Sequence, residues 1–464
     1  MNPAVPAHFD LASLAADYAA RRYTPRDVVQ EALARTEAAG DNPIWIHRAS
    51  REELLAQADA LMARAAPGTD ASARLPLYGV PFAVKDNIDV AGMPTTAACP
   101  AYAYLPTQHA TAVAKLIAAG ALVIGKTNLD QFATGLVGAR SPYGTVRNSF
   151  DPRYISGGSS SGSGVAVSLG QVAFALGTDT AGSGRVPAAF NSIVGLKPTR
   201  GLVSNTGMVP ACRSLDCVSV FALNCRDATR VLAAMEGYDA ADPYSRRAEP
   251  AATLPASGFR FAVPQADQLE FHGDDAYRAL FAASVERLQG LGGTPVTTDF
   301  APFFAAQALL YSGPWIAERT AELGSFLDTH PDAVHPVTRQ VVESGLGYTA
   351  VDAFRAQHRL AALARATEPV WENADLLLVP GAPTIYPIAA VHDDPVTLNS
   401  RLGLYTNFVN LLDLAALTVP AGYRPDGLPF GVTLIGPAFS DRALATLGAR
   451  LHAAGCDTAG ACRA

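Results

Sequence analysis

The sequence has little of what marks a disulfide-rich, membrane-spanning or nucleic-acid-binding protein. Only six of its 464 residues are cysteine, and none of them forms a C-x-x-C pair, which argues against a disulfide framework or a zinc site. No apolar run approaches the roughly 20 residues that cross a bilayer, and the first residues do not resemble a signal peptide. The formal net charge is −7, so we expect no basic surface for nucleic acid or membrane. These absences predict a cytoplasmic protein whose partners are small molecules.

What the chain has in quantity is apolar residues, which make up 49% of it against 17% charged residues. That proportion is enough to bury a large core without disulfides or metals. Helical and strand patterns alternate along the chain, which predicts an α/β fold with a mixed central β-sheet covered by helices on both faces. We expect one catalytic domain over residues 1–464. Ala- and Pro-rich stretches flank an insertion-like subdomain at about 254–380.

Capping signals place two helices near the N-terminus. Thr24 precedes Pro25 and has an acidic residue three positions on, which predicts a helix to about residue 38. Ser50 and Glu53 repeat the capping pattern before a second helix that runs to about residue 65. Short runs of apolar and β-branched residues predict strands, with helical stretches between most of them. The expected strands are 78–84, 121–124, 172–176, 259–263, 376–379 and 431–435.

The most unusual part of the sequence is rich in glycine and serine, at 155–164 and again at 177–187. Apolar sequence resumes on both sides, which argues against a flexible linker. Glycine lets the backbone approach a ligand closely, and serine supplies hydroxyl groups for nucleophilic attack or proton transfer. One interpretation is the nucleophile elbow of an α/β-hydrolase, since 158–162 reads G-x-S-x-G around Ser160. That motif needs a preceding strand and a later histidine partner, and the sequence favours neither.

A second interpretation is a phosphate-binding P-loop, because 120–127 satisfies G-x-x-x-x-G-K-[ST]. The four residues between the glycines are Ala-Leu-Val-Ile, which is a buried strand pattern rather than a phosphate-cradling loop. We therefore expect Lys126 to lie at the end of a strand and not to bind phosphate.

A third interpretation rests on three blocks: Gly-Val-Pro-Phe-Ala-Val-Lys-Asp-Asn at 79–87, Gly-Gly-Ser-Ser-Ser-Gly-Ser at 157–163 and Gly-Thr-Asp-Thr-Ala-Gly-Ser-Gly-Arg at 177–185. In the order and spacing of these blocks, the chain resembles the amidase signature family over roughly residues 10 to 450. Three further sequence motifs resemble the allophanate hydrolase branch of this family rather than the amidase component of the transfer-RNA amidotransferase. These motifs lie at 129–135, 181–190 and 212–219.

The resemblance implies a serine hydrolase with a Ser-Ser-Lys triad. Ser183 corresponds to the nucleophile, Ser159 to the residue that relays its proton, and Lys85 to the base. The relay serine of the family follows a cis peptide bond, which places one between Gly158 and Ser159. Backbone N–H groups in a Gly-rich turn stabilise the oxyanion of the intermediate. The resemblance assigns this oxyanion hole to Thr180, Ala181, Gly182 and Ser183.

Elementary chemistry agrees with a lysine in this role. Serine is a weak nucleophile that needs a nearby base, and lysine serves as one when burial lowers its pKa. Lys85 follows the apolar run 80–84, which carries it toward a poorly hydrated site, so we expect a neutral amine. Without the serine blocks, a structural lysine at the end of an edge strand would be the simpler interpretation. Asp179 and Arg185 flank the oxyanion turn, and we interpret them as an ion pair that fixes it.

The branch implies the substrate as well. Allophanate is a carbamate anion joined to a urea, so a selective site must neutralise and orient a carboxylate. The segment 309–319 resembles the one from which the branch supplies a tyrosine and an arginine, here Tyr311 and Arg319. We expect both on one helix, on neighbouring faces. A solvated helix face, with Arg319 paired to Glu318 or Glu322, is the alternative.

The resemblance thus implies hydrolysis of allophanate with release of ammonia and carbon dioxide, in the breakdown of urea or of s-triazines such as cyanuric acid. We expect a homodimer that uses no metal and no organic cofactor. Another small amide, such as malonamate or biuret, is the alternative substrate, and a catalytically inactive binding protein is the alternative class. Members of the branch commonly continue into a further C-terminal domain, which we expect to be absent here.

Overall fold

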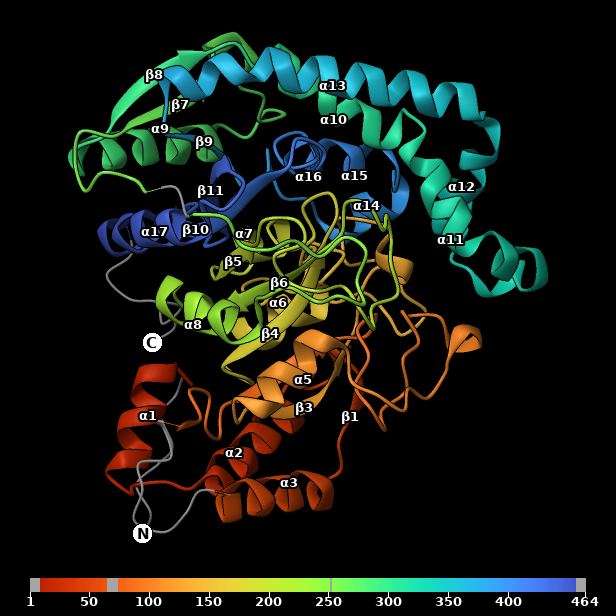
Figure 1. Ribbon diagram of the computed structural model, residues 1–464, viewed down its shortest axis with the longest axis vertical. Helices are drawn as coiled ribbons and strands as arrows, with labels where there is room; N and C mark the ends of the chain where they lie inside the picture. The colour runs from red at the N-terminus through yellow and green to blue at the C-terminus, as the bar shows by residue number, and fades with distance from the viewer. Residues whose placement is uncertain (1–8, 65–73, 251–252, 456–464) are drawn as a thin grey trace.

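The computed structural model describes residues 9–64, 74–250 and 253–455. In these residues one mixed sheet of 11 strands runs through the molecule in the order β1-β3-β2-β4-β6-β5-β10-β11-β9-β7-β8 (Figure 1). The strands are β1 (Trp45–Arg48), β2 (Pro81–Lys85), β3 (Leu122–Thr127), β4 (Phe174–Asp179), β5 (Val194–Lys197), β6 (Cys217–Ala222), β7 (Arg260–Pro264), β8 (Thr294–Thr298), β9 (Leu376–Pro380), β10 (Leu414–Tyr423) and β11 (Pro429–Pro437). Strand β2 is parallel to both of its neighbours, as is β7, and the remaining pairs are antiparallel.

Helices cover both faces of the sheet. Strand β9 shows this directly, because its successive side chains point to opposite faces. Leu376 and Leu378 belong to the large core cluster that includes Leu451, whereas Leu377 belongs to a second cluster that includes Phe408. The α/β fold with a mixed, doubly covered sheet is therefore confirmed. The helices are α1 (Leu11–Ala19), α2 (Pro25–Ala38), α3 (Arg51–Arg64), α5 (Thr111–Ala118), α6 (Ser161–Ser168), α7 (Val186–Phe190), α8 (Cys225–Met235), α9 (Asp275–Gly290), α10 (Ala301–Tyr311), α11 (Trp315–Thr329), α12 (Pro336–Glu343), α13 (Ala350–Asn373), α14 (Ile388–Asp393), α15 (Thr397–Leu402), α16 (Phe408–Leu411) and α17 (Asp441–Gly455).

The local signals in the sequence predicted helices α2 and α3 and six strands correctly. Thr24 and Asp27 form the expected capping box of α2, and Ser50 and Glu53 exchange hydrogen bonds at the start of α3. Each expected strand lies on a strand of the sheet, with ends that differ by up to three residues. Five strands were not predicted: β1, β5, β6, β8 and β10. Two of these, β1 and β5, are only four residues long, which is too short for a clear alternation.

The segment 254–380 contributes to the same sheet as the rest of the chain. It supplies β7, β8 and β9, which form one end of the sheet. Its helices α10 to α13 run along the top and right of the view in Figure 1. Helix α10 packs against α13 and α16, and α11 packs against α12. In the described ranges no helix is both long enough and apolar enough to cross a membrane.

The topology brings the blocks 79–87, 157–163 and 177–185 together. Strands β2 and β4 are parallel neighbours, so their C-terminal ends lie at the same edge of the sheet. Lys85 is the last residue of β2, and the turn 180–185 follows the end of β4. The segment 155–160 leads into α6, which packs against both of these strands. The fold therefore places all three blocks at one edge.

The cysteines take no part in disulfide bonds in the described residues. Those described are free and buried, which agrees with small apolar side chains in a core: Cys99, Cys212, Cys217 and Cys225. Cys456 and Cys462 lie outside the described residues.

Candidate active site

Lys85, Ser159 and Ser183 meet in a continuous chain of hydrogen bonds. Ser159 Oγ lies 2.8 Å from Lys85 Nζ and 2.9 Å from Ser183 Oγ. The exposed fraction of Lys85 and of Ser159 is 0%, and that of Ser183 is 3%. The peptide bond between Gly158 and Ser159 is cis, as the resemblance predicted. Residues from three separate blocks of sequence thus form one connected group of side chains.

The Lys85 amine has hydroxyl partners and no carboxylate partner within the described residues. Besides Ser159, its nitrogen bonds Thr178 Oγ1 at 2.7 Å. Burial lowers the pKa of Lys85 to about 7, and the more distant carboxylates of Asp130 and Asp216 oppose this shift. A large fraction of the amine is therefore neutral near neutral pH. This agrees with the expectation that Lys85 can accept a proton.

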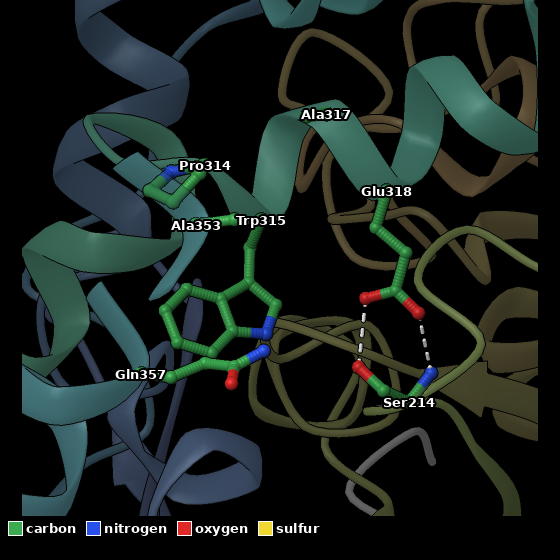
Figure 2. A pocket seen from close by; sticks show the side chains of 7 residues that line it. All are labelled: Ser214, Pro314, Trp315, Ala317, Glu318, Ala353 and Gln357. Carbon is green, nitrogen blue, oxygen red and sulfur yellow. Dashed lines mark hydrogen bonds between the residues drawn. The ribbon is translucent and has the colours of Figure 1, made fainter. Parts of the chain in front are cut away.

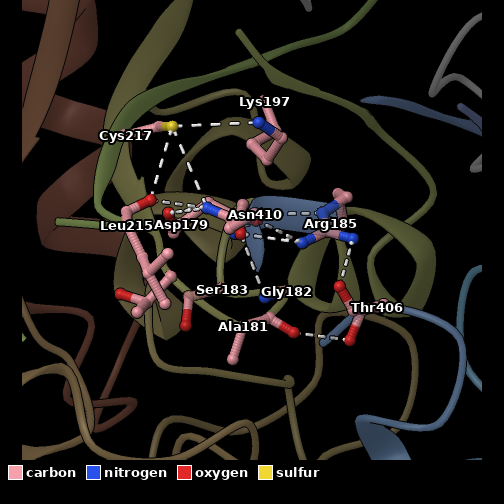
Figure 3. A network of polar contacts seen from close by, with 12 residues as sticks. Asp179, Ala181, Gly182, Ser183, Arg185, Lys197, Leu215, Cys217, Thr406 and Asn410 are labelled. Atoms are coloured by element: carbon pink, nitrogen blue, oxygen red, sulfur yellow. Dashed lines mark hydrogen bonds and ion pairs between the residues drawn. The ribbon is translucent and has the colours of Figure 1, made fainter. Parts of the chain in front are cut away.

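An ion pair supports the turn that carries Ser183 (Figure 3). The Nε and Nη2 atoms of Arg185 each lie 2.8 Å from a different carboxylate oxygen of Asp179, and both side chains are fully buried. Burial alone would raise the pKa of Asp179, but the guanidinium of Arg185 holds it below its ordinary value. The same carboxylate accepts the N–H groups of Gly182 and Gly184, each at 3.0 Å. The ion pair predicted from the sequence is therefore present and holds the backbone of the turn.

These contacts decide which backbone donors of the turn remain available. The N–H group of Gly182 is bonded to Asp179, so it points away from a ligand at the turn. The N–H groups of Ala181 and Ser183 have no hydrogen-bond partner in the described part of the chain. Unbonded N–H groups beside a reactive hydroxyl are the donors that an oxyanion hole requires.

The prediction that Tyr311 and Arg319 share one helix is wrong. Tyr311 is the last residue of α10, and Arg319 lies in α11, which begins at residue 315. The chain turns at Gly313 and Pro314, because proline lacks the N–H group that would continue α10. Glycine is needed at 313, since a Cβ there would lie 2.4 Å from the carbonyl oxygen of Leu309. The two side chains nevertheless meet, since the Arg319 guanidinium lies 5.5 Å from the centre of the Tyr311 ring.

Arg319 is a buried cation with an incomplete set of partners. Its exposed fraction is 1%, and its Nη1 atom donates to Thr134 Oγ1 at 3.1 Å. Its Nε and Nη2 atoms have no hydrogen-bond partner in the described residues. Glu318 and Glu322 bond residues of the 213–214 segment instead, so the solvated-face alternative is wrong. A buried guanidinium with unpaired donors is costly unless an anion completes its surroundings.

The first turn of α11 also lines a separate cavity of about 310 Å³ (Figure 2). Trp315 and Gln357 lie side by side on one wall, and Glu318 lies on the other. Both oxygens of Glu318 are occupied at 2.7 Å by the N–H and hydroxyl groups of Ser214. None of the triad residues lines this cavity. It is therefore distinct from the site around Ser183.

Asp130 supports the segment that carries Ser159, and the sequence analysis gave it no role. Its N–H group donates to the carbonyl oxygen of Ser159 at 3.0 Å. Its carboxylate accepts the backbone N–H groups of Val137, Gly138 and Arg140. The signal for this role in the sequence was the position of the aspartate, soon after a predicted buried strand and within the motif at 129–135.

Asp216 is a second carboxylate that the sequence analysis did not single out. Burial raises its pKa to about 6, against hydrogen bonds from the Thr180 hydroxyl and the backbone N–H of Ala211 that lower it. It connects the 211–216 segment to the first residue of the oxyanion turn. Its position within the motif at 212–219 was the only signal in the sequence for a role of Asp216.

The two competing motifs have ordinary structural roles. Ser160 occupies the N-cap position of α6, but its hydroxyl donates to the carbonyl oxygen of Thr178 at 3.1 Å instead of capping the helix. No strand of the described sheet ends at Ser160. The residues of the P-loop pattern form β3, as expected. Lys126 lies in that strand and pairs with Asp86 at 3.0 Å. In the part of the chain that is described, no three His, Cys, Asp or Glu side chains are grouped so as to hold a metal ion.

Known proteins resemble the chain over most of its length. Urea amidolyase of Saccharomyces cerevisiae is 48% identical over 413 residues, which cover 88% of this chain and 22% of that protein. A solved structure of Kluyveromyces lactis allophanate hydrolase is 42% identical with a TM-score of 0.90, over 96% of this chain and 73% of that one. A glutamyl-tRNA(Gln) amidotransferase component of Exiguobacterium sibiricum is 33% identical over 79% of this chain and 82% of its own. The chain spans less than a quarter of the length of the urea amidolyases that it matches.

These identities agree with the order of resemblance inferred from the sequence. The chain is more similar to the urea amidolyase and allophanate hydrolase proteins than to the amidotransferase component. The Amidase family model matches residues 27–445, a range that includes the whole hydrogen-bonded chain from Lys85 to Ser183. With a family match of this extent and a relative of similar length at 33% identity, the chain belongs to the amidase family.

Proposed function

We propose that the protein is an amidohydrolase that cleaves allophanate (urea-1-carboxylate) and releases ammonia. The observation that carries the reaction type is the hydrogen-bonded chain Lys85–Ser159–Ser183 beside a turn with unbonded N–H donors. The observation that carries the substrate is the buried Arg319 with two unpaired nitrogens. The similarity to allophanate hydrolase and urea amidolyase proteins supports the same substrate.

The first half of the reaction forms an acyl-enzyme. Ser183 attacks the terminal amide carbonyl while its proton passes to Ser159 and the proton of Ser159 passes to the neutral amine of Lys85. Hydroxyl hydrogens rotate freely enough to reverse the direction of this chain when the amine is deprotonated. The negative charge on the carbonyl oxygen is stabilised by the N–H groups of Ala181 and Ser183, within the turn that Thr180 and Gly182 complete.

The second half of the reaction releases the products. The leaving nitrogen takes the proton back from Ser159 and departs as ammonia, and Lys85 returns to its neutral form. Water then attacks the acyl-enzyme by the same proton route and frees Ser183. The product is a carboxylated carbamate, which decomposes further to ammonia and carbon dioxide. No step in this scheme calls for a metal or an organic cofactor.

Arg319 and Tyr311 give the site its preference for an anion. A guanidinium binds a carboxylate through a planar fork of donors, and the Nε and Nη2 atoms that lack partners among the described residues supply such a fork. The Tyr311 ring lies against the guanidinium and limits its movement. The carboxylate of allophanate would complete the coordination of the buried cation. A neutral amide such as biuret offers no such charge.

We also propose how the enzyme is organised, where it acts and how it assembles. We assign residues 1–464 to one catalytic domain, with 254–380 as an insertion-like part of it that also contributes strands to the sheet. We place the enzyme in the cytoplasm as a homodimer, in urea or s-triazine nitrogen breakdown. Because the chain spans only part of its urea amidolyase relatives, the overall activity of those proteins is not assigned to it.

The test is ammonia release by the full chain from allophanate, malonamate, biuret and urea. We expect rapid release from allophanate, none from Ser183→Ala, and most of the activity from the matched Ser160→Ala variant. A phosphonate label should attach to Ser183. Label on Ser160 would overturn the triad, whereas an active enzyme that prefers another of these amides would overturn only the substrate.

A further inference from the structure

One peptide group of the oxyanion turn is held at both of its ends. The carbonyl oxygen of Ala181 accepts the hydroxyl of Thr406 at 2.6 Å, and the N–H of Gly182 donates to Asp179 at 3.0 Å (Figure 3). These two groups belong to the same peptide unit, which is planar and rigid. Its orientation is therefore fixed by a hydroxyl on one side and a carboxylate on the other.

The two holding groups are themselves connected. Arg185 bonds both oxygens of Asp179, and its Nη1 atom donates to the carbonyl oxygen of Thr406 at 3.0 Å. Asn410 adds a second connection, since its side-chain amide donates to the carbonyl oxygen of Asp179 at 2.8 Å. The contacts from Thr406 through the 181–182 peptide, Asp179 and Arg185 back to Thr406 form a closed ring.

From this ring we infer that Thr406 is a positioning residue for the oxyanion hole, an inference that rests on the proposed function of Ser183. Holding the 181–182 peptide fixes the planes on either side of it, which carry the N–H groups of Ala181 and Ser183. Both of these donors are unbonded among the described residues. Thr406 does not need to touch the substrate, because it acts on the direction of these donors.

The Thr406 hydroxyl also packs against the backbone of Gly182. Gly182 has a φ of +136°, and a Cβ at this position would lie 2.5 Å from Thr406 Oγ1. Thr406 therefore packs directly against the glycine backbone as well as bonding its neighbour. Its own exposed fraction is 0%, so water cannot replace the hydroxyl if it is removed.

The expected effect of removing the hydroxyl is on turnover. Losing an oxyanion-hole donor outright lowers kcat by roughly 10²- to 10³-fold. Thr406→Val keeps the shape of the side chain but releases the carbonyl end of the 181–182 peptide, which lets the donors tilt without removing them. We therefore expect kcat to fall roughly 10- to 100-fold, since small misplacements at a reacting centre have effects of this size. KM should change much less than kcat.

The matched control is Thr367→Val. Thr367 is also buried and also donates to a backbone carbonyl, that of Ala364 at 2.8 Å, but it lies in α13. Thr406→Ser is the rescue variant, because it keeps the hydroxyl. The measurements are kcat and KM for allophanate, the rate at which a fluorophosphonate labels Ser183, and the pH at which activity is half-maximal on the acid side.

We expect Thr406→Val to lower both kcat and the labelling rate, Thr406→Ser to restore most of each, and Thr367→Val to leave both near wild type. The pH of half-maximal activity should stay unchanged in all of them, since Lys85 is untouched. Wild-type labelling by Thr406→Val would overturn the inference, as would a serine variant as slow as the valine variant. If the wild type itself is not labelled at Ser183, it is the proposed function that fails.

Discussion

Two buried lysines on neighbouring strands have opposite surroundings. Lys126 in β3 pairs with the carboxylate of Asp86 at 3.0 Å, whereas Lys85 at the end of β2 bonds only hydroxyl groups among the described residues. Burial lowers the pKa of both, but Asp86 directly opposes the shift at Lys126. Lys85 is left with a pKa of about 7. Lys85, which has no carboxylate partner among the described residues, can therefore exchange a proton near neutral pH.

Two buried arginines differ in the same way, since one is paired with a carboxylate and the other, in the described part of the chain, is not. Arg185 bonds both oxygens of Asp179 and the carbonyl oxygen of Thr406. Arg319 is as deeply buried, yet within the described ranges it bonds only the Thr134 hydroxyl and keeps two nitrogens unpaired. Paired cations therefore hold the structure here, whereas unpaired cations are left for the substrate and the proton.

Replacing the unpaired lysine should have the largest effect on catalysis. We expect Lys85→Met to lower kcat by roughly 10²- to 10⁴-fold, the usual range for loss of a general base. The variant should fold, because no carboxylate loses a partner. Since the folded-state pKa of Lys85 lies below its unfolded value, folding favours the neutral amine, and wild-type stability falls as pH drops from about 10 to 7. Unfolding in urea should therefore show a larger gain in stability for Lys85→Met at pH 7 than at pH 10.

The paired lysine should respond in the opposite way. Lys126→Met leaves Asp86 buried without its cation, so we expect the free energy of unfolding to fall by about 3–5 kcal/mol. Equilibrium unfolding in urea measures this directly. The double variant Lys126→Met/Asp86→Asn should recover part of the loss, because it removes the unpaired charge. Equal losses of stability in Lys85→Met and Lys126→Met would contradict the distinction between the two lysines.

Arg319→Ala tests the unpaired arginine and should have an intermediate effect. A charge-assisted contact contributes about 1.5–3 kcal/mol, which corresponds to roughly one to two decades in kcat/KM for allophanate. Neutral propionamide should be affected far less, because it has no carboxylate to bind. Steady-state kinetics on both substrates provides the comparison. If kcat/KM falls equally for both, Arg319 supports the fold and the anion binds elsewhere.

The smallest expected effect concerns the second hydroxyl on Lys85. Activity should fall on the acid side with a single ionisation near pH 7, because only the neutral amine accepts a proton. The ammonium form donates to Thr178 Oγ1, so Thr178→Val removes a partner that favours this form. The midpoint of the pH profile should then move about 0.5–1 unit lower. An upward shift would mean that burial does not set the pKa of Lys85.

Much of the fold followed from local patterns. Capping residues and apolar runs predicted α2, α3 and six strands, because these signals act over a few residues. The three blocks placed Lys85, Ser159 and Ser183 together through a resemblance, and the parallel pairing of β2 with β4 supplies the physical reason. The prediction that residues 309–319 form one helix was wrong, because a spacing that fits two helical turns does not by itself reveal the helix break at Gly313 and Pro314.

What the sequence determined by itself was the set of chemical groups: two serines, a lysine and a glycine turn, in an α/β chain with many apolar residues. Which charges are paired and which peptide groups are held depends on contacts between distant segments, which exist only in the folded chain. Thr406 reaches Ala181 from 225 residues away, and its hydroxyl gives no local signal of that contact. Burial and the partners supplied by distant segments set the pKa of Lys85 and leave two nitrogens of Arg319 without hydrogen-bond partners among the described residues. The reason is that desolvation and hydrogen bonding depend on the whole environment of a group rather than on its neighbours in sequence.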